Sequence, residues 1–400
     1  MDQIEELLTR GVDTIYPTKE ELEKVLRSGK KLTLYQGFDP TGDKLHVGHM
    51  VGLMKMADWQ RLGHHVIFLI GDGTGQAGDP SGKTKSRDTF FTKEQLRENA
   101  KDYVMQASKI VDFEGDNPIE IKYNSDWLNI LDLPKMLEIF DHASLQQLIE
   151  RDLFQERLKN KERVSMREFL YPLLQGYDSV AMGVDLEIGG TDQTFNMLVG
   201  RQFVKDYLNK EKYVMTTPLL TDATGNKIGK TEGNAIAITD NPAELYAKIM
   251  TFPDEVVVKS FEYLTRIPMN KVKEIEKAIS GGENPMVYKK KLAYAIAAML
   301  NSDEDAASAQ EAFEKNVQRG ELPEEITEVS LSDTDEEFVN EDLLVDLNLA
   351  SSKSDAKRLF QQGGVEVNGK RIVDSNKNIQ ITNGMIIKVG KRKIVKLKSG

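Results

Sequence analysis

The residues with the clearest potential for chemistry are two histidines three positions apart, His46 and His49. They follow an apolar run at 32–38, a break at Pro40 and Gly42, and then open a stretch with helical periodicity. A strand that turns into a helix N-terminus forms an anion site, because the first backbone N–H groups have no partner within the helix. Histidines at i and i+3 share a face and add donors for phosphate oxygens. An ordinary strand–helix corner with two surface histidines is the alternative.

Three further segments combine glycines with polar or charged side chains. Residues 71–83 contain five glycines after an apolar run, which is typical of backbone that approaches a ligand. Residues 186–193 repeat the order of strand, glycines and helix, and residues 224–233 place two lysines and a threonine on a glycine-rich loop. Lysines on such a loop can close over a polyphosphate. The simpler interpretations are a mobile loop, a helix cap at Thr191 or Asp192, and a solvated turn.

These segments need a scaffold, and the alternation of short apolar runs with helical stretches between about 32 and 220 predicts one. This pattern is typical of βαβ units, which form a predominantly parallel sheet that binds ligands at the carboxyl ends of its strands. The expected strands are 32–38, 66–70, 119–123 and 184–188. Residues 241–317 have helical spacing and open with Asn241 as a cap and Pro242 at the first helical position.

The length of 400 residues exceeds one comfortable core and predicts several domains. We expect an α/β catalytic domain at 1–222, the lysine loop and an α-helical domain at 223–320, an acidic linker at 321–340, and a small α+β domain at 341–400. In the last domain a helix near 355–362 precedes an Asn-Gly hairpin signal at Asn368.

Charge is distributed unevenly along the chain. The last sixty residues hold 12 Lys/Arg against 6 Asp/Glu, whereas the remainder has a net charge of −17. A basic domain on an acidic body predicts contact with the phosphate backbone of a nucleic acid. A solubilising charged end is the alternative.

Composition excludes several classes of protein. The absence of cysteine excludes disulfides and thiol catalysis and removes the usual structural zinc ligands. No apolar run approaches the roughly 20 residues of a membrane span. The acidic N-terminus lacks the basic segment of a secretion signal. We therefore expect a cytoplasmic protein with no membrane partner and no dedicated metal site.

Together these segments resemble class I aminoacyl-tRNA synthetases, in which a His-x-Gly-His helix start and a lysine-rich loop flank one ATP site. Here they read His46-Val47-Gly48-His49 and Lys227-Ile228-Gly229-Lys230-Thr231. Residues 35–41, 78–83, 171–178 and 189–193 resemble motifs of the bacterial tyrosyl-tRNA synthetase family, and the last sixty residues resemble its S4 RNA-binding domain. The resemblance covers nearly the whole chain. It implies a Rossmann-like catalytic domain, an α-helical anticodon-binding domain and a small α+β S4-like domain.

The resemblance implies a tyrosine–tRNA ligase. Such an enzyme activates L-tyrosine with ATP, which gives tyrosyl-adenylate and pyrophosphate, and then transfers the tyrosyl group to the 3′ end of tRNA(Tyr). The attacking carboxylate is already ionised, so positioning and charge neutralisation carry the rate without a general base. Mg²⁺ bound with ATP and a homodimer are also implied.

The same resemblance assigns roles to individual residues. Asp79, Tyr171 and Gln175 would receive the ammonium of tyrosine, and Tyr35 and Asp178 its hydroxyl. Gln193 would bind its carboxylate. The residues that would bind ATP are Gly37, Asp39, Gly48, Gly190, Asp192 and Lys230. The residues that would act on its phosphates as catalytic groups are Thr41, His46, His49, Lys83, Arg87, Lys227, Lys230 and Thr231.

Two alternatives stay open at this point. A tryptophanyl-tRNA synthetase shares the scaffold, but Tyr35 and Asp178 as a hydroxyl-binding pair and the S4-like tail argue against it. An RNA-binding or splicing-assistance protein that has lost catalysis is disfavoured because His46, His49, Lys227 and Lys230 are all intact. Tyrosine-dependent ATP–pyrophosphate exchange distinguishes all three.

Overall fold

The computed structural model describes eleven stretches of the chain, with the remaining residues left out. These are residues 2–42, 44–81, 90–149, 152–225, 227–228, 235–315, 327–330, 336, 338–375, 379–390 and 393–398. The chain divides into two compact units, Met1–Ala306 and Ala307–Gly400, and each is described by itself. The finer boundary expected at residue 222 stays a prediction.

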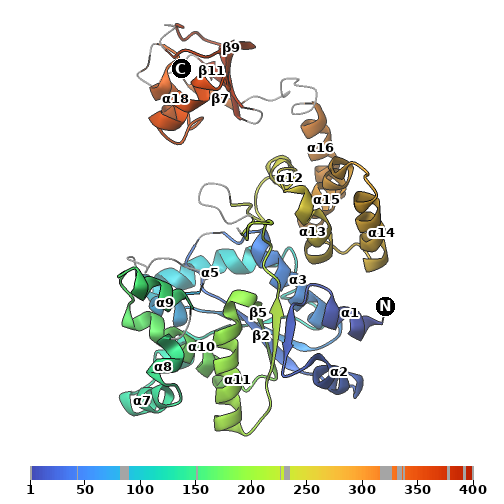
Figure 1. Ribbon diagram of the computed structural model, residues 1–400, viewed down its shortest axis with the longest axis vertical. Coiled ribbons are helices and arrows are strands. Elements are labelled where there is room, and N and C mark those ends of the chain that lie inside the picture. The colour runs from blue at the N-terminus through green and yellow to red at the C-terminus, as the bar shows by residue number, and fades with distance from the viewer. Residues whose placement is uncertain are drawn as a thin grey trace. The chain divides into compact units, whose positions relative to one another are not determined.

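A six-stranded sheet forms the centre of the first unit (Figure 1). Its strands are β1 (Thr14–Tyr16), β2 (Thr33–Phe38), β3 (His65–Ile70), β4 (Glu120–Tyr123), β5 (Leu186–Gly190) and β6 (Tyr213–Thr217). They lie in the order β1-β6-β5-β2-β3-β4, and every neighbouring pair is parallel except β1 and β6. The expected predominantly parallel sheet is confirmed. Strands β1 and β6 were not among the expected strands.

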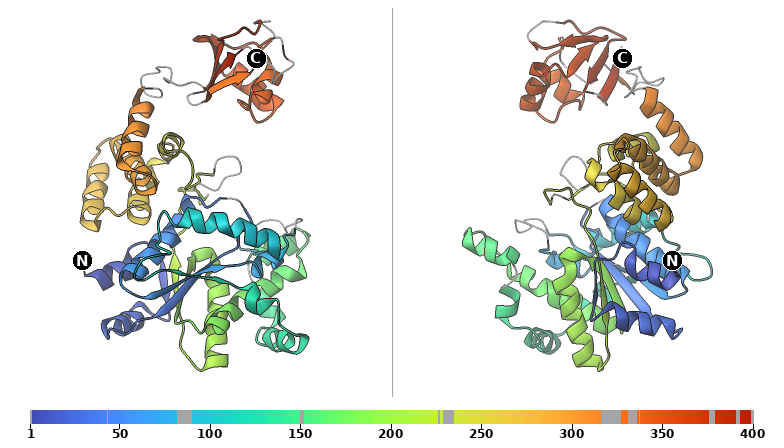
Figure 2. Two further views of the ribbon diagram at one scale, coloured as in Figure 1. Left: turned by 180° about the vertical axis from the view of Figure 1, so that it is seen from behind. Right: turned by 45° about the vertical axis from the view of Figure 1, so that its right-hand side comes forward.

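Helices cover both faces of this sheet. Before β5 they are α1 (Gln3–Thr9), α2 (Lys19–Arg27), α3 (Val47–Arg61), α4 (Thr74–Ala77), α5 (Lys93–Ala107), α6 (Ser125–Leu128), α7 (Leu133–Asp141), α8 (Leu145–Ile149), α9 (Asp152–Lys159) and α10 (Met166–Met182). After β5 come a 3₁₀ turn, η1 (Thr191–Gln193), and α11 (Thr194–Leu208). Helix α3 packs on one face, and α10 and α11 pack together on the other (Figure 2).

Helix α3 is apolar on almost every side, and its surroundings explain why. Met50, Leu53, Met56 and Trp59 are all fully buried. The helix packs on β2, β3 and β5 and also contacts α1 and α13 (Val257–Leu264). Burial on several sides fixes the position of its N-terminus, which carries the two histidines.

The rest of the first unit is helical, as the sequence predicts. Its other elements are α12 (Pro242–Ile249), the 3₁₀ turn η2 (Asp254–Val256), α14 (Met269–Ser280), α15 (Pro285–Leu300) and α16 (Asp303–Phe313), which runs into the second unit. The predicted cap is confirmed, because the side chain of Asn241 accepts a hydrogen bond from the Glu244 backbone and Pro242 opens α12.

The second unit contains a five-stranded sheet in the order β7-β11-β10-β8-β9. Its strands are β7 (Thr327–Ser330), β8 (Val365–Val367), β9 (Lys370–Ile372), β10 (Ile386–Val389) and β11 (Lys393–Lys398), and its helices are α17 (Glu341–Asp346) and α18 (Lys353–Gln361). Asn368 and Gly369 both have positive φ between β8 and β9, which confirms the predicted hairpin.

The segment expected to be an acidic linker, 321–340, contributes to this second sheet. Strand β7 pairs in parallel with β11, and Glu328 forms ion pairs with Lys396 and Lys398. Val339 is buried in the core of the same unit. Glu328 therefore matches the basic strand β11, a pairing that local composition does not reveal.

Candidate active site

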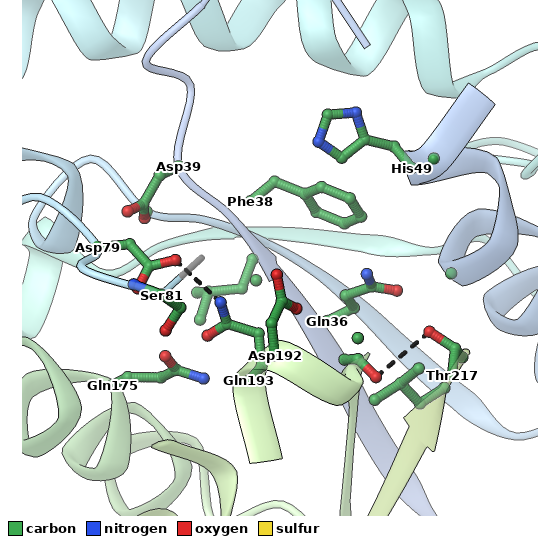
Figure 3. A pocket seen from close by; sticks show the side chains of 18 of the residues that line it. Gln36, Phe38, Asp39, His49, Asp79, Ser81, Gln175, Asp192, Gln193 and Thr217 are labelled. Carbon is green, nitrogen blue, oxygen red and sulfur yellow. Dashed lines mark hydrogen bonds between the residues drawn. The ribbon is translucent and has the colours of Figure 1, made fainter. Parts of the chain in front are cut away.

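A cavity of about 370 Å³ opens where β2, β3 and β5 end, at the edge of the sheet to which the parallel strands point (Figure 3). It gathers segments that lie far apart in the chain. The expected site residues that line it are Tyr35, Gly37, Asp39, Thr41, His46, Gly48, His49, Asp79, Tyr171, Gln175, Asp178, Gly190, Asp192, Gln193 and Lys227. The other expected residues, Lys83, Arg87, Lys230 and Thr231, lie outside the described residues.

At one end of the cavity the two histidines form the start of α3. His46 is the N-cap, and its Nδ1 accepts a hydrogen bond from the Gly48 backbone at 3.1 Å. Nδ1 of His49 accepts from the His46 backbone at 3.1 Å, and the two rings stack at 3.9 Å. In a neutral histidine this bonding puts the ring hydrogen on Nε2, which is then a donor. The histidines therefore cap the helix as well as facing the cavity.

Gly48 makes this arrangement possible. A Cβ atom at this position would lie 2.9 Å from Cε1 of His46, which is closer than atoms in contact can approach. The absence of a side chain at Gly48 thus makes room for the ring of His46.

Asp192 and Lys227 also line the cavity. Their side chains form an ion pair at 2.7 Å, and each is about a quarter exposed. The 3₁₀ turn and α11 have no side-chain cap, so the interpretation of Thr191 or Asp192 as a helix cap was wrong. Asp192 instead holds the first lysine of the glycine-rich loop against the cavity.

The opposite end is a chain of hydrogen bonds between side chains. Nε2 of Gln193 donates to Asp79 at 2.9 Å (Figure 3), and Oε1 of Gln193 accepts from Asn196 at 2.9 Å. Asn196 also donates to Oε1 of Gln175 at 3.0 Å, and Nε2 of Gln175 donates to Glu187 at 2.9 Å. Each amide therefore has one orientation that satisfies its neighbours.

Tyr171 is hydrogen-bonded to Asp39, and both line the cavity. Its hydroxyl donates to one oxygen of Asp39 at 2.9 Å, and Thr74 donates to the other at 2.7 Å. Burial, with Asp39 as the nearest negative charge, raises the pKa of Tyr171 well above its usual value. Tyr171 therefore stays a neutral donor.

The deepest part of the cavity contains Tyr35 and Asp178, each 1 % exposed. The Tyr35 hydroxyl hydrogen-bonds Ser179 at 2.9 Å. Asp178 accepts from Trp127 at 2.7 Å and from Asn124 at 3.0 Å. Burial raises the pKa of Asp178 well above its ordinary value, although these two donors oppose the shift.

Beneath Tyr35 lies a buried ion pair that no motif in the sequence predicts. Lys212 and Glu187 are 0 % and 2 % exposed in their side chains and are in direct contact. Burial lowers the pKa of Lys212, and the negative charge of Glu187 opposes that change. Lys212 also donates to Ser179 at 2.6 Å. The pair thus connects to both the hydroxyl of Tyr35 and the amide of Gln175.

One polar residue near the cavity faces away from it. Asp72 follows β3 in the glycine-rich segment, is fully buried, and forms an ion pair with Arg97 at 2.7 Å. It also accepts hydrogen bonds from Ser125. Its polarity therefore belongs to the packing of α5 and α6, and the cavity wall on this side is made by Thr74 and Leu69.

Sequence models of known protein families match this chain from residue 27 to residue 395. A sequence model described as tRNA synthetases class I (W and Y) matches residues 27–318. One described as Tyrosine–tRNA ligase SYY-like C-terminal domain matches residues 319–395. The fold is thus that of the class I tRNA synthetases that comprise the tryptophan and tyrosine enzymes.

Individual relatives narrow this class. The tyrosine–tRNA ligase of Thermotoga maritima is 40% identical over 98% of this chain and 97% of its own. That of Aquifex aeolicus is 38% identical over 96% and 95%. A C-terminally truncated mitochondrial tyrosyl-tRNA synthetase of Coccidioides posadasii, a solved structure, superposes with a TM-score of 0.63 at 25% identity over 78% of this chain and 91% of its own. The chain belongs to the tyrosyl-tRNA synthetase family.

Proposed function

We propose that this chain is a tyrosine–tRNA ligase that binds L-tyrosine and ATP together in the cavity, forms tyrosyl-adenylate there, and transfers the tyrosyl group to tRNA(Tyr). The observation that carries the proposal is that one cavity joins a buried hydroxyl-binding end to a helix start with two histidines. A helix N-terminus suits phosphates, and a buried hydroxyl-binding end suits a phenol.

The polar chain and its neighbours would bind the amino acid. Asp79 supplies a negative charge for the ammonium, and Tyr171 and Gln175 complete its surroundings. Tyr35 and Asp178 lie deepest and would meet the phenol hydroxyl, while Gln193 would steady the carboxylate. Because every side chain here is already held by another, the site is organised before tyrosine arrives.

The helix start would bind the nucleotide. Donors from His46 and His49 and the N-terminal end of α3 would stabilise the charge that develops on the α-phosphate as the carboxylate attacks. Thr41, Gly48 and Lys227 would contact the phosphates, and Asp39, Gly37, Gly190 and Asp192 the nucleoside. Pyrophosphate leaves, and the mixed anhydride keeps the tyrosyl group activated.

Mg²⁺ would enter with ATP. Within the described part of the chain, no group of three or more His, Asp or Glu side chains could hold a metal ion alone. Asp39 and Asp192 nevertheless present carboxylate oxygens to the cavity, and such oxygens suit Mg²⁺ when substrate phosphates supply the remaining ligands.

The direct test is exchange of pyrophosphate into ATP by the purified chain. We expect exchange with tyrosine and at most a trace with phenylalanine or tryptophan. Charging of tRNA(Tyr) with labelled tyrosine tests the second step. Absence of tyrosine-dependent exchange in a folded sample would overturn the proposal.

The second unit would bind tRNA. Lys357, Lys370 and Arg371 are exposed on α18 and β9, whereas Lys398 is paired with Glu328 at 2.9 Å. Replacing Lys370 and Arg371 by alanine should weaken tRNA binding and reduce the slope of log affinity against log salt by about 1.5, with adenylate formation unchanged. Lys398→Ala is the matched control. An unchanged slope in the double variant would exclude this face.

We also place the enzyme in the cytoplasm as a homodimer. Its tRNA substrate and the ribosomes that use the product are in that compartment.

The homodimer is supported by large apolar side chains that are exposed on the first unit, namely Ile130, Leu133, Leu137, Leu145, Leu158 and Met166. Among the described residues, no helix has the length and hydropathy to cross a membrane. A monomeric sedimentation coefficient at micromolar concentration would contradict the dimer.

A further inference from the structure

The ion pair of Lys212 and Glu187 is buried, and the Glu187 side chain also lines the cavity. A buried ion pair is by itself weak evidence for stability, although removing one partner leaves a costly unpaired charge. Gly200 on α11 leaves the space that the ammonium occupies. A Cβ atom there would lie 2.6 Å from Nζ of Lys212 and 2.9 Å from Oγ of Ser179. The packing of α11 thus accommodates a lysine head group in the interior.

The contacts of Lys212 give the hydrogen bonds around it a direction. An ammonium group only donates, so Oγ of Ser179 accepts at 2.6 Å. Ser179 has one hydrogen of its own and two acceptors within reach. Tyr35 lies at 2.9 Å and Glu187 at 3.4 Å, and only the first distance is that of an ordinary O–H···O bond. Either oxygen of the Tyr35–Ser179 bond can be the donor, and with Lys212 donating to Ser179 the shorter distance favours placing the hydrogen of Ser179 on Tyr35.

The consequence reaches the cavity. Since the Tyr35 oxygen then accepts from Ser179, its own hydrogen is left for Glu187, which also hydrogen-bonds Tyr35, or for a hydroxyl in the space that both side chains line. Across that space, Asp178 in its ionised form only accepts, and Asn124 and Trp127 fix its orientation. A donor thus faces an acceptor, and a hydroxyl is the group that satisfies both.

We propose that Lys212 is a positioning residue for substrate specificity, which sets the direction of a hydrogen-bond chain that runs through Ser179 and Tyr35 to the hydroxyl of bound tyrosine and ends at Asp178. The inference rests on the proposed function. Phenylalanine would leave the donor of Tyr35 and the acceptor of Asp178 unpaired in the interior, which is costly. If Lys212 or Ser179 is removed, Tyr35 can turn its hydrogen elsewhere, and this discrimination weakens.

The test compares kcat/KM for tyrosine and phenylalanine in ATP–pyrophosphate exchange. Ser179→Ala and Lys212→Met should each lower the preference for tyrosine about tenfold, through a higher KM for tyrosine and an unchanged KM for ATP. Lys212→Met with Glu187→Gln should recover part of the preference, because the new amide can place an N–H where Glu187 Oε2 faces Ser179. The matched control is Lys210→Met, whose lysine pairs with Asp185 at 2.9 Å on the same segment.

A preference in Ser179→Ala equal to that of the parent would overturn the proposal, as would an equal loss for both amino acids. Ser179→Ala removes only one hydroxyl, so it decides the matter even if Lys212→Met does not fold. Failure of the parent enzyme to exchange with tyrosine would instead refute the proposed function, and the two failures are therefore distinguishable.

Discussion

The side chains proposed to bind the amino acid hydrogen-bond one another inside the protein, whereas those proposed to bind the nucleotide belong to a helix start and to a partly exposed ion pair. Tyr35 and Asp178 are each 1 % exposed, while the side chains of Asp192 and Lys227 are 24 % and 29 % exposed. Both ends line the same cavity.

The difference corresponds to what each end must do. A small substrate that differs from a competitor by one hydroxyl is selected by buried groups that would be left unpaired by the wrong ligand. A triphosphate is recognised by charge, and its leaving group must depart, so donors near solvent suffice. These tasks explain why the groups for the amino acid are buried and those for the phosphates are partly exposed. The variants below test the two sets of groups separately.

The largest expected effect is at the buried end. Asp178→Ala should lower kcat/KM for tyrosine about 100-fold, because a hydrogen bond to a charged group is lost in the interior. ATP binding, measured by equilibrium titration, should be retained. Asp185→Ala is a suitable control, since Asp185 accepts from the Thr33 backbone outside the cavity. Near-normal activity of Asp178→Ala would refute the assignment of the hydroxyl-binding end.

The second effect divides the two roles of His46. His46→Ala removes both the cap and the donor, and should lower kcat about 30-fold and the free energy of unfolding by about 1 kcal/mol. His46→Asn keeps a side-chain acceptor for the Gly48 backbone, so it should retain stability and lose the same rate. Denaturant unfolding and pre-steady-state adenylate formation measure the two quantities. If the asparagine variant were fully active, His46 would be a cap alone.

A smaller effect is expected at the ion pair. Lys227→Met should lower kcat about tenfold with an unchanged KM for tyrosine, because charge neutralisation at the phosphates is weakened. A double-mutant cycle with Asp192→Asn should give a coupling of about 1 kcal/mol or less, as for other partly exposed pairs. A much larger coupling would mean that Lys227 serves mainly to hold Asp192.

The sequence predicted the two ends unequally. The helix start, the glycine-rich segments and the sheet come from local patterns: strand, glycine and helix follow one another within a few residues, and the resemblance assigns their roles. All of the predicted site residues that the structure describes line one cavity. The helix cap at Thr191 or Asp192 was wrong because the partner of Asp192 is Lys227, 35 residues away.

The residues that hold the buried end could not be predicted. Ser179 looks like a small residue within a helix, and Lys212 like one more charge in the run Lys210-Glu211-Lys212. They meet because α10 and α11 pack together and β6 begins directly after Lys212. Only tertiary packing brings such side chains together, so no spacing in the sequence reveals them. The position of Lys212 beside Gly200 on α11 becomes visible only in the folded chain.

The smallest effect is a pH dependence that separates the ends without a substitution. Burial raises the pKa of Asp178 well above that of an ordinary aspartate, which is about 4. On acidification this carboxyl therefore gains its proton at a higher pH than an ordinary aspartate does. The protonated form no longer accepts the tyrosine hydroxyl, so KM for tyrosine should rise several-fold as pH falls through that raised pKa. KM for ATP should change less over the same range.

The same linkage predicts that the folded state binds the extra proton, so the contribution of Asp178 to stability is largest at low pH and declines as pH rises through the raised pKa. A KM for tyrosine that stays constant until an ordinary aspartate titrates would show that Asp178 is not desolvated in the free enzyme, and the contrast between the two ends would then rest on hydrogen bonding alone.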